Sequence, residues 1–138
     1  MPNMAYSWRG DYLLVVHSAS PPTEAEWDDY VASIRAHDVV RIRNLVFTDG
    51  GAPNSTQRKQ VTEALNGRTV PAAVVSPSNL VRGVVTALSW FNPKIKAFSP
   101  NELEQAIKYL GISGPDVTVL LAEMKRLRAQ VAQAPVKQ

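Results

Sequence analysis

The stretch from Ile42 to Leu65, IRNLVFTDGGAPNSTQRKQVTEAL, constrains the fold of this chain more than any other. An apolar run ends at Asp49, two glycines follow, and a polar segment with helix-capping residues comes next. Glycine accepts backbone angles that other residues resist, so the chain can turn sharply there and expose its amide groups. The stretch therefore predicts a buried strand, a tight turn and a capped helix, the junction at which α/β proteins place ligands.

Apolar patterns on both sides of this stretch predict that strands and helices alternate along the chain. Thr23 with Glu26, and Ser99 with Glu102, have the spacing of a capping box. Strands are expected at Tyr12–Val16, Val39–Thr48, Val70–Val75 and Ile95–Phe98, with a short antiparallel strand over Ala5–Arg9. Helices are expected to follow Thr23, Asn54 or Ser55, Ser76 (with Pro77 in the first turn) and Ser99, and to span Pro115 to about Gln133.

This order of elements predicts the fold class. Parallel neighbours need a crossover connection, and the helices of the crossovers cover the sheet. We therefore expect an α/β fold with a mostly parallel sheet of four to five strands. Residues 1–114 are expected to form this single domain, and residues 115–138 to add a C-terminal amphipathic helix and a loose tail.

The expected C-terminal helix carries an apolar stripe that has two explanations. The stripe packs on the chain's own sheet, or it joins two copies of the chain, because its spacing approaches the a/d alternation of a coiled coil. It is longer than a sheet of this size needs, so a homodimer is the favoured prediction. The stripe consists of Val117, Leu120, Leu121, Met124, Leu127 and Val131.

Composition narrows the classes of function. The 138 residues carry 15 Lys and Arg against 12 Asp and Glu, and the basic residues are scattered, so no nucleic-acid partner is expected. The chain has no cysteine, and its two histidines lack a visible metal partner, so we expect no metal and no other cofactor. The sequence shows no secretory signal pattern and no apolar run that approaches a membrane span, so a cytoplasmic protein is expected.

The helix expected after Ser76 is apolar around most of its circumference. An apolar surface of this extent predicts that something outside the sheet covers one face. Trp90 and Phe91 either complete the core or belong to that interface, and a lipid or apolar ligand is the alternative occupant. The apolar residues are Leu80, Val81, Val84, Val85, Leu88, Trp90 and Phe91.

Three segments combine strand ends, small turn residues and helix starts. They are LVFTDGGAPNS at Leu45–Ser55, AAVVSPSNLVRGVV at Ala72–Val85 and FSPNELEQAI at Phe98–Ile107. Over roughly Tyr12–Leu110 the chain resembles the STAS family, the domain shared by anti-sigma-factor antagonists and sulphate transporters. The resemblance implies a STAS-like fold and a bacterial signalling switch without enzyme activity. In such a switch, an anti-sigma-type kinase phosphorylates a serine beside the aspartate, and the phosphate controls partner choice.

The chain departs from this family pattern beside Asp49. Gly50 stands where the resemblance implies a serine, and Gly51 follows it, so neither residue can accept a phosphate. The nearest hydroxyl groups belong to Thr48, Ser55 and Thr56. Ser55 and Thr56 are the expected phosphorylation sites, because added negative charge is stabilised at the start of a helix.

The carboxyl ends of parallel strands meet at one edge, so His17, Asp49, Ser76 and Ser99 are expected to lie along a ligand-binding crevice. The serines can instead be N-caps, and Asp49 can bind turn amides. We predict a non-enzymatic regulatory or interaction module that binds a protein. The alternatives are a small-ligand or lipid-binding protein and, less favoured, an acid–base enzyme that uses Asp49. The expected partner-binding residues are Asp49, Gly50, Gly51, Ser55, Arg58, Lys59, Ser76 and Arg82.

Overall fold

A computed structural model describes residues 1–88 and 94–131 of the chain. Its centre is a five-stranded sheet in the order β1-β2-β3-β4-β5, in which β1 is antiparallel to β2 and the other neighbours are parallel. The sequence thus correctly predicted an α/β protein with a mostly parallel sheet. The strands are β1 (Met4–Arg9), β2 (Tyr12–His17), β3 (Arg43–Thr48), β4 (Ala72–Val75) and β5 (Ile95–Phe98).

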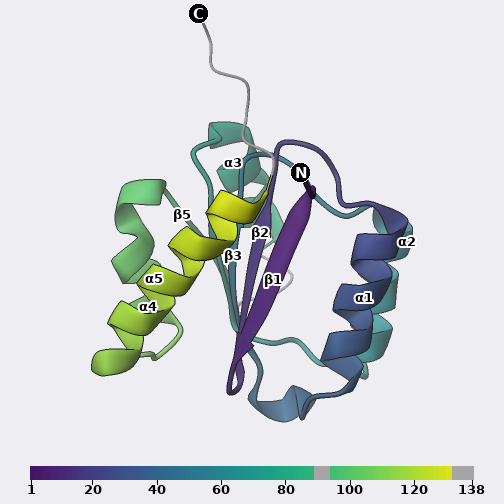
Figure 1. The fold of residues 1–138 in the computed structure, drawn as a ribbon, viewed down its shortest axis with the longest axis horizontal. Helices are drawn as coiled ribbons and strands as arrows, with labels where there is room; N and C mark the ends of the chain where they lie inside the picture. The colour runs from purple at the N-terminus through teal and green to yellow at the C-terminus, as the bar shows by residue number, and fades with distance from the viewer. Residues whose placement is uncertain (89–93, 132–138) are drawn as a thin grey trace, which may run out of the picture.

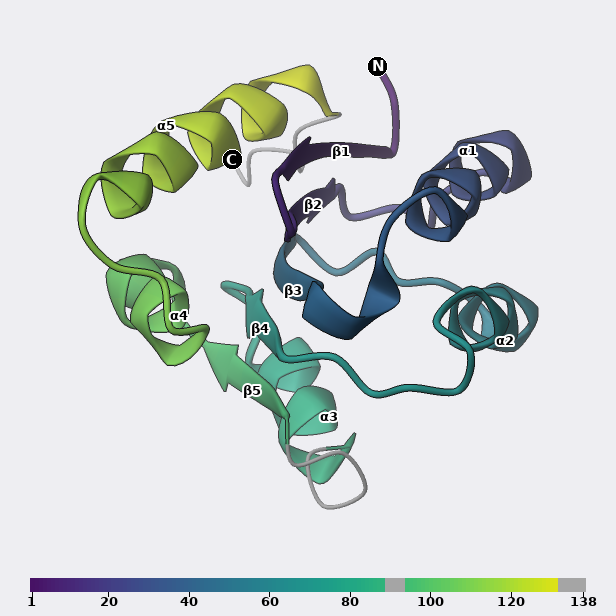
Figure 2. The ribbon, with the colours of Figure 1, turned by 90° about the horizontal axis from the view of Figure 1, so that it is seen from below.

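Five α-helices surround this sheet in two layers. They are α1 (Glu24–Arg35), α2 (Ser55–Ala64), α3 (Asn79–Leu88), α4 (Leu103–Tyr109) and α5 (Pro115–Gln130). Helices α1, α2 and α3 lie on one side of the sheet, and α4 and α5 lie on the other (Figure 2). Right-handed crossovers explain the first layer, because parallel strands that follow one another in sequence order bring all connecting helices to the same face. Within the described ranges, none of these helices has the length and apolarity to cross a membrane.

Alternating side chains of β2 supply both faces of the core. Leu13 and Val15 pack with the residues of α1, including Trp27 and Ile34. Leu14 and Val16 belong to the other cluster, with the apolar side chains of α4 and α5. All four β2 residues are buried. Two covered faces require apolar side chains at successive positions, as at these four inner residues of β2.

The apolar stripe of α5 packs on the chain's own sheet. Helix α5 crosses β1 and β2 (Figure 1). Leu120, Met124, Leu127 and Val131 are each 1% exposed, and Val117 and Leu121 are partly buried against the same cluster. This stripe is therefore not available to join a second copy of the chain.

Helix capping follows the sequence at most positions. Thr23 and Glu26 form the predicted capping box of α1, and Asn54, one of the two expected residues, caps α2 in a box with Gln57. The strand expected over Val39–Thr48 is shorter in the structure, where β3 begins at Arg43. Residues Val39–Arg41 instead form a 3-10 turn, and Asp38 caps the start of this turn. The expected helix at Ser99 likewise begins with a 3-10 turn before α4.

Candidate functional site

The carboxyl ends of the four parallel strands lie together, as predicted. His17 is paired with Thr48, and Phe47 is paired with Val75. Val75 is in turn paired with Phe98, so the loops that follow β2 to β5 leave the sheet at one level. The strand order does not reverse among these parallel strands, so the edge lacks the switch point at which open α/β sheets form their ligand crevice.

Hydrogen bonds tie the loop after β3 to the loop after β2. The amide of Asp49 donates to the carbonyl oxygen of His17 at 3.2 Å, and the amide of Gly51 donates to that of Ser18 at 2.8 Å. The Thr48 hydroxyl donates to the carbonyl oxygen of Gly51 at 2.7 Å and accepts from the amide of Gly50 at 3.0 Å. Hydrogen bonds within the turn and to the neighbouring loop thus fix the conformation of Thr48–Gly51.

Gly51 is required by a close approach of two loops. A Cβ atom at this position would lie 2.2 Å from the carbonyl oxygen of Ser20 and 2.5 Å from that of Ser18. Gly51 is also buried. Gly50 has a different role, because it is exposed and its φ angle of 133° is one that side-chained residues rarely adopt. Of the two glycines, only Gly50 lies at the surface.

Ser76 has a structural position rather than the capping position that the sequence suggested. It is fully buried, and its hydroxyl donates to the carbonyl oxygen of Thr48 at 2.6 Å. Helix α3 begins two residues later than Pro77, and the Ser78 hydroxyl accepts from the amide of Val81 at 3.2 Å. The side chain of Ser76 is therefore not accessible to a protein partner. Its hydrogen bond instead links the start of the loop after β4 to the start of the loop after β3.

The remaining predicted partner-binding residues lie at or near the surface. Ser55, Arg58 and Lys59 are exposed on α2, as is Thr56. Asp49 is half-buried. Arg82 is also half-buried, and its guanidinium donates to the carbonyl oxygen of Ser76 at 2.6 Å. The structure thus places the loops that lead to α2 and to α3 at the same edge of the sheet, with Asp49 and Gly50 in the loop that leads to α2.

Helix α3 presents an apolar face that the rest of the described chain leaves uncovered. Leu80 is 79% exposed and Val84, one turn later, is 53% exposed. Val85 is buried at 6% exposure, so α3 packs on the sheet with its opposite side. The exposed pair agrees with the apolar excess seen in the sequence. Trp90 and Phe91, which we also assigned to the core or to this surface, lie outside the described residues.

His17 is buried at the end of β2. Its ring lies 6.3 Å from the ring of Trp27, and its Nδ1 has no hydrogen-bond partner among the described residues. Burial lowers the pKa of His17 to about 4, against a smaller opposing effect of the nearby Glu26 carboxylate. Across the described ranges, no hydrogen bond links the His17 and Asp49 side chains, so the geometry gives no support to an acid–base pair of these two residues.

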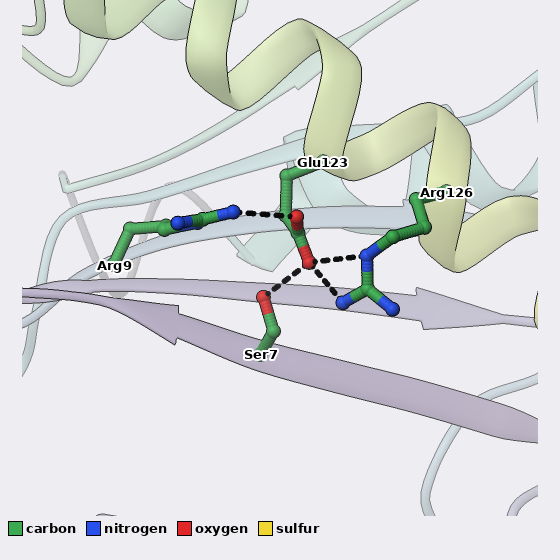
Figure 3. A network of polar contacts seen from close by, with 4 residues as sticks. All are labelled: Ser7, Arg9, Glu123 and Arg126. Carbon is green, nitrogen blue, oxygen red and sulfur yellow. Dashed lines mark hydrogen bonds and ion pairs between the residues drawn. The ribbon is translucent and has the colours of Figure 1, made fainter.

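A buried carboxylate that the sequence did not indicate fixes α5 to β1 (Figure 3). Glu123 is 5% exposed and accepts hydrogen bonds from Ser7 at 3.0 Å, from Arg9 at 2.9 Å and from Arg126. The Arg126 guanidinium, followed by Arg9 and Ser7, lowers the pKa of Glu123 to about 2 against the effect of burial. Only the amphipathic spacing of α5 was visible in the sequence, and Ser7 and Arg9 lie too far away along the chain to be paired with Glu123 by inspection.

Metal binding has no candidate in the part of the chain that the structure describes, which contains no group of three or more His, Cys, Asp or Glu residues able to hold an ion. Comparisons with protein-family models, with curated proteins and with solved structures gave no match to this chain. The resemblance to the STAS family therefore depends on the three sequence motifs alone.

Proposed function

We propose that this protein is a non-enzymatic interaction module of STAS-like type that binds a protein partner through the α2–α3 surface. We define this surface by Asp49, Gly50, Ser55, Arg58 and Lys59, together with Leu80 and Val84 of α3. The exposed Leu80–Val84 pair carries the proposal, because adjacent exposed apolar side chains mark interaction sites more often than scattered ones do. Gly51 and Ser76 are left out because both are buried.

The chemistry of the partner follows from the two helices. An apolar patch on the partner would cover Leu80 and Val84, and acidic side chains would face Arg58 and Lys59. A protein of the anti-sigma kinase type is one candidate that the motifs suggest. A second copy of this chain is another, so a homodimer remains a prediction, with α3 in place of α5 as its surface.

Capture from the native cell tests the proposal. Wild-type protein is compared with a Leu80→Ser, Val84→Ser variant and with an Arg58→Glu, Lys59→Glu variant. A Val119→Ser variant serves as the control, because Val119 is an exposed apolar residue at the other end of the molecule. We expect both test variants, but not the control, to lose the same partner. An identical set of captured proteins for all four would contradict the surface.

Phosphorylation of the α2 start is a second part of the proposal. Ser55 is the first residue of α2 and Thr56 the second, and both are exposed. A phosphate there would lie at the positive end of the helix dipole and close to free amide groups. Mass spectrometry of the protein from its own host should find the phosphate on Ser55 or Thr56. Unmodified protein under all growth conditions would favour a constitutive binder.

A further inference from the structure

We propose that a hollow at the opposite end of the sheet binds a small anion that carries an apolar tail or ring. This basal hollow has a volume of about 870 Å³. Its lining residues come from the turn between β1 and β2, the 3-10 turn before β3 and the start of α5. These segments lie at the lower end of the ribbon in Figure 1. Its size is within the range of roughly 300–1,000 Å³ that small-molecule sites occupy.

The charge of the basal hollow favours an anion. Among the described residues, Arg9, Arg41, Arg43 and Lys94 line it, together with two acidic side chains, Asp11 and Asp116. Within the described ranges, no ion pair joins Arg9, Arg41 or Arg43 to these two acids. Arg9 is engaged by Glu123 at 2.9 Å, so Arg41 and Arg43 are the cations best placed to receive a ligand.

Arg43 is positioned by a hydrogen bond to contact an anionic ligand. It is half-buried, and one of its terminal nitrogens donates to the carbonyl oxygen of Leu110 at 2.7 Å, at the end of α4. That bond fixes the side chain on the wall of the basal hollow. A guanidinium has five N–H donors, so most of its donors remain for a carboxylate or a phosphate.

The basal hollow also has an apolar part. Val40 is 62% exposed and Val119 is 43% exposed, and both line it. They come from segments far apart in the sequence, the 3-10 turn before β3 and the first turns of α5. Exposed valines beside arginines make an amphipathic wall, which matches a ligand with an anionic head and an apolar body better than it matches inorganic phosphate.

Isothermal titration calorimetry of the full chain tests this inference with four probes. Decanoate and decyl phosphate combine the decyl tail with two anionic heads, decyltrimethylammonium joins the same tail to a cation, and inorganic phosphate lacks a tail. We expect one or both anionic amphiphiles to bind, with their order showing which head is preferred, and the other two probes to bind much more weakly. Amide chemical shifts should change at residues 40–43 and 116–120.

Three variants distinguish binding in the basal hollow from attraction to the overall positive charge of the protein. Arg41→Glu should weaken binding of the anionic amphiphile roughly tenfold, as loss of a charged hydrogen bond does. Lys125→Glu makes the same charge change on the exposed side of α5, outside the basal hollow, and should leave binding unchanged. Val119→Ser, which leaves every charge in place, should also weaken binding. Equal binding of the cationic amphiphile, equal weakening by Arg41→Glu and Lys125→Glu, or no binding of either anionic amphiphile would overturn the inference.

This site is independent of the α2–α3 surface, since it lies at the other end of the parallel strands. Failure of the ligand titration would leave the capture experiment untouched. Conversely, loss of the protein partner in the Leu80→Ser, Val84→Ser variant should not alter binding of the anionic amphiphile.

Discussion

Gly51 and Gly83 show that glycines of one chain can have opposite effects on stability. At Gly51 an added Cβ would collide with backbone oxygen atoms, the nearer at 2.2 Å, whereas nothing lies within 4 Å of the Cβ position at Gly83. Gly83 lies inside α3, where alanine is the better helix former. We expect Gly51→Ala to lower the free energy of unfolding by about 1–3 kcal/mol and Gly83→Ala to raise it by about 0.5–1 kcal/mol. Urea denaturation measures both, and equal effects of the two substitutions would contradict the packing of the loop.

His17 should make stability depend on pH in a defined window. Its pKa is about 4 in the folded chain, below the ordinary value of 6.5, so the unfolded chain takes up a proton first as the pH falls. The contribution is complete above pH 6.5 and is lost as the pH decreases towards 4, at a cost of about 3 kcal/mol. Urea denaturation of wild type and of His17→Gln between these values checks it. The variant should lack this slope, and the same slope in both proteins would assign it to other groups.

At the scale of the elements, Glu123 connects α5 with β1. Glu123→Gln keeps the shape but removes the charge that three side chains bind, so we expect a loss of about 1–2 kcal/mol in the free energy of unfolding at neutral pH. The difference should shrink as the pH falls from 4.5 towards 2, because the unfolded wild type takes up a proton at Glu123 first, while the folded carboxylate stays ionised until the pH nears 2. Glu104→Gln is the matched control.

Glu104 pairs with Lys108 at 3.6 Å on an exposed surface, and such a pair adds little stability. Its loss should change the free energy of unfolding by less than about 0.5 kcal/mol. If the two substitutions had the same effect, Glu123 would be no more than a surface charge.

The elements that the sequence predicted well are those with local signals. The capping box of Thr23 and Glu26 predicted the start of α1, because its two residues are three positions apart, and Asn54 was one of the two cap residues expected for α2. Ser76 misled the prediction, because a serine beside a proline resembles a cap, whereas its hydroxyl in fact binds Thr48 across the sheet. The pairing of Ser7 and Arg9 with Glu123 depends on strand order, which no local pattern encodes.

At the scale of the whole molecule, α5 belongs to the core. The sequence left its role open, because a stripe of apolar residues packs equally well on a sheet or on a second helix. The sheet decides the question, since β1 and β2 offer an apolar face that α5 covers. The exposed apolar pair of the candidate site, by contrast, was visible in the sequence as an excess of apolar residues after Ser76.

A chain that ends at Gly114 should therefore fail to fold. It lacks Leu120, Met124 and Leu127, each 1% exposed, and loss of one such side chain costs about 2–5 kcal/mol. Circular dichroism with urea titration should show no cooperative transition for the truncated chain. Leu120→Glu in the full chain should also be strongly destabilising. A truncated chain that unfolds cooperatively and sediments as a monomer, beside a dimeric full-length chain, would return α5 to the role of a dimer interface.

The central claim is that the α2–α3 surface binds a protein, and crosslinking in the native cell tests it most directly. A photo-crosslinking amino acid replaces Leu80 in one variant and Val119 in another, because both residues are exposed but lie at opposite ends of the molecule. We predict a discrete protein adduct from position 80 and none from position 119. An adduct of twice the chain's mass would identify a second copy as the partner. No protein adduct from position 80, or one from position 119 alone, would contradict the account.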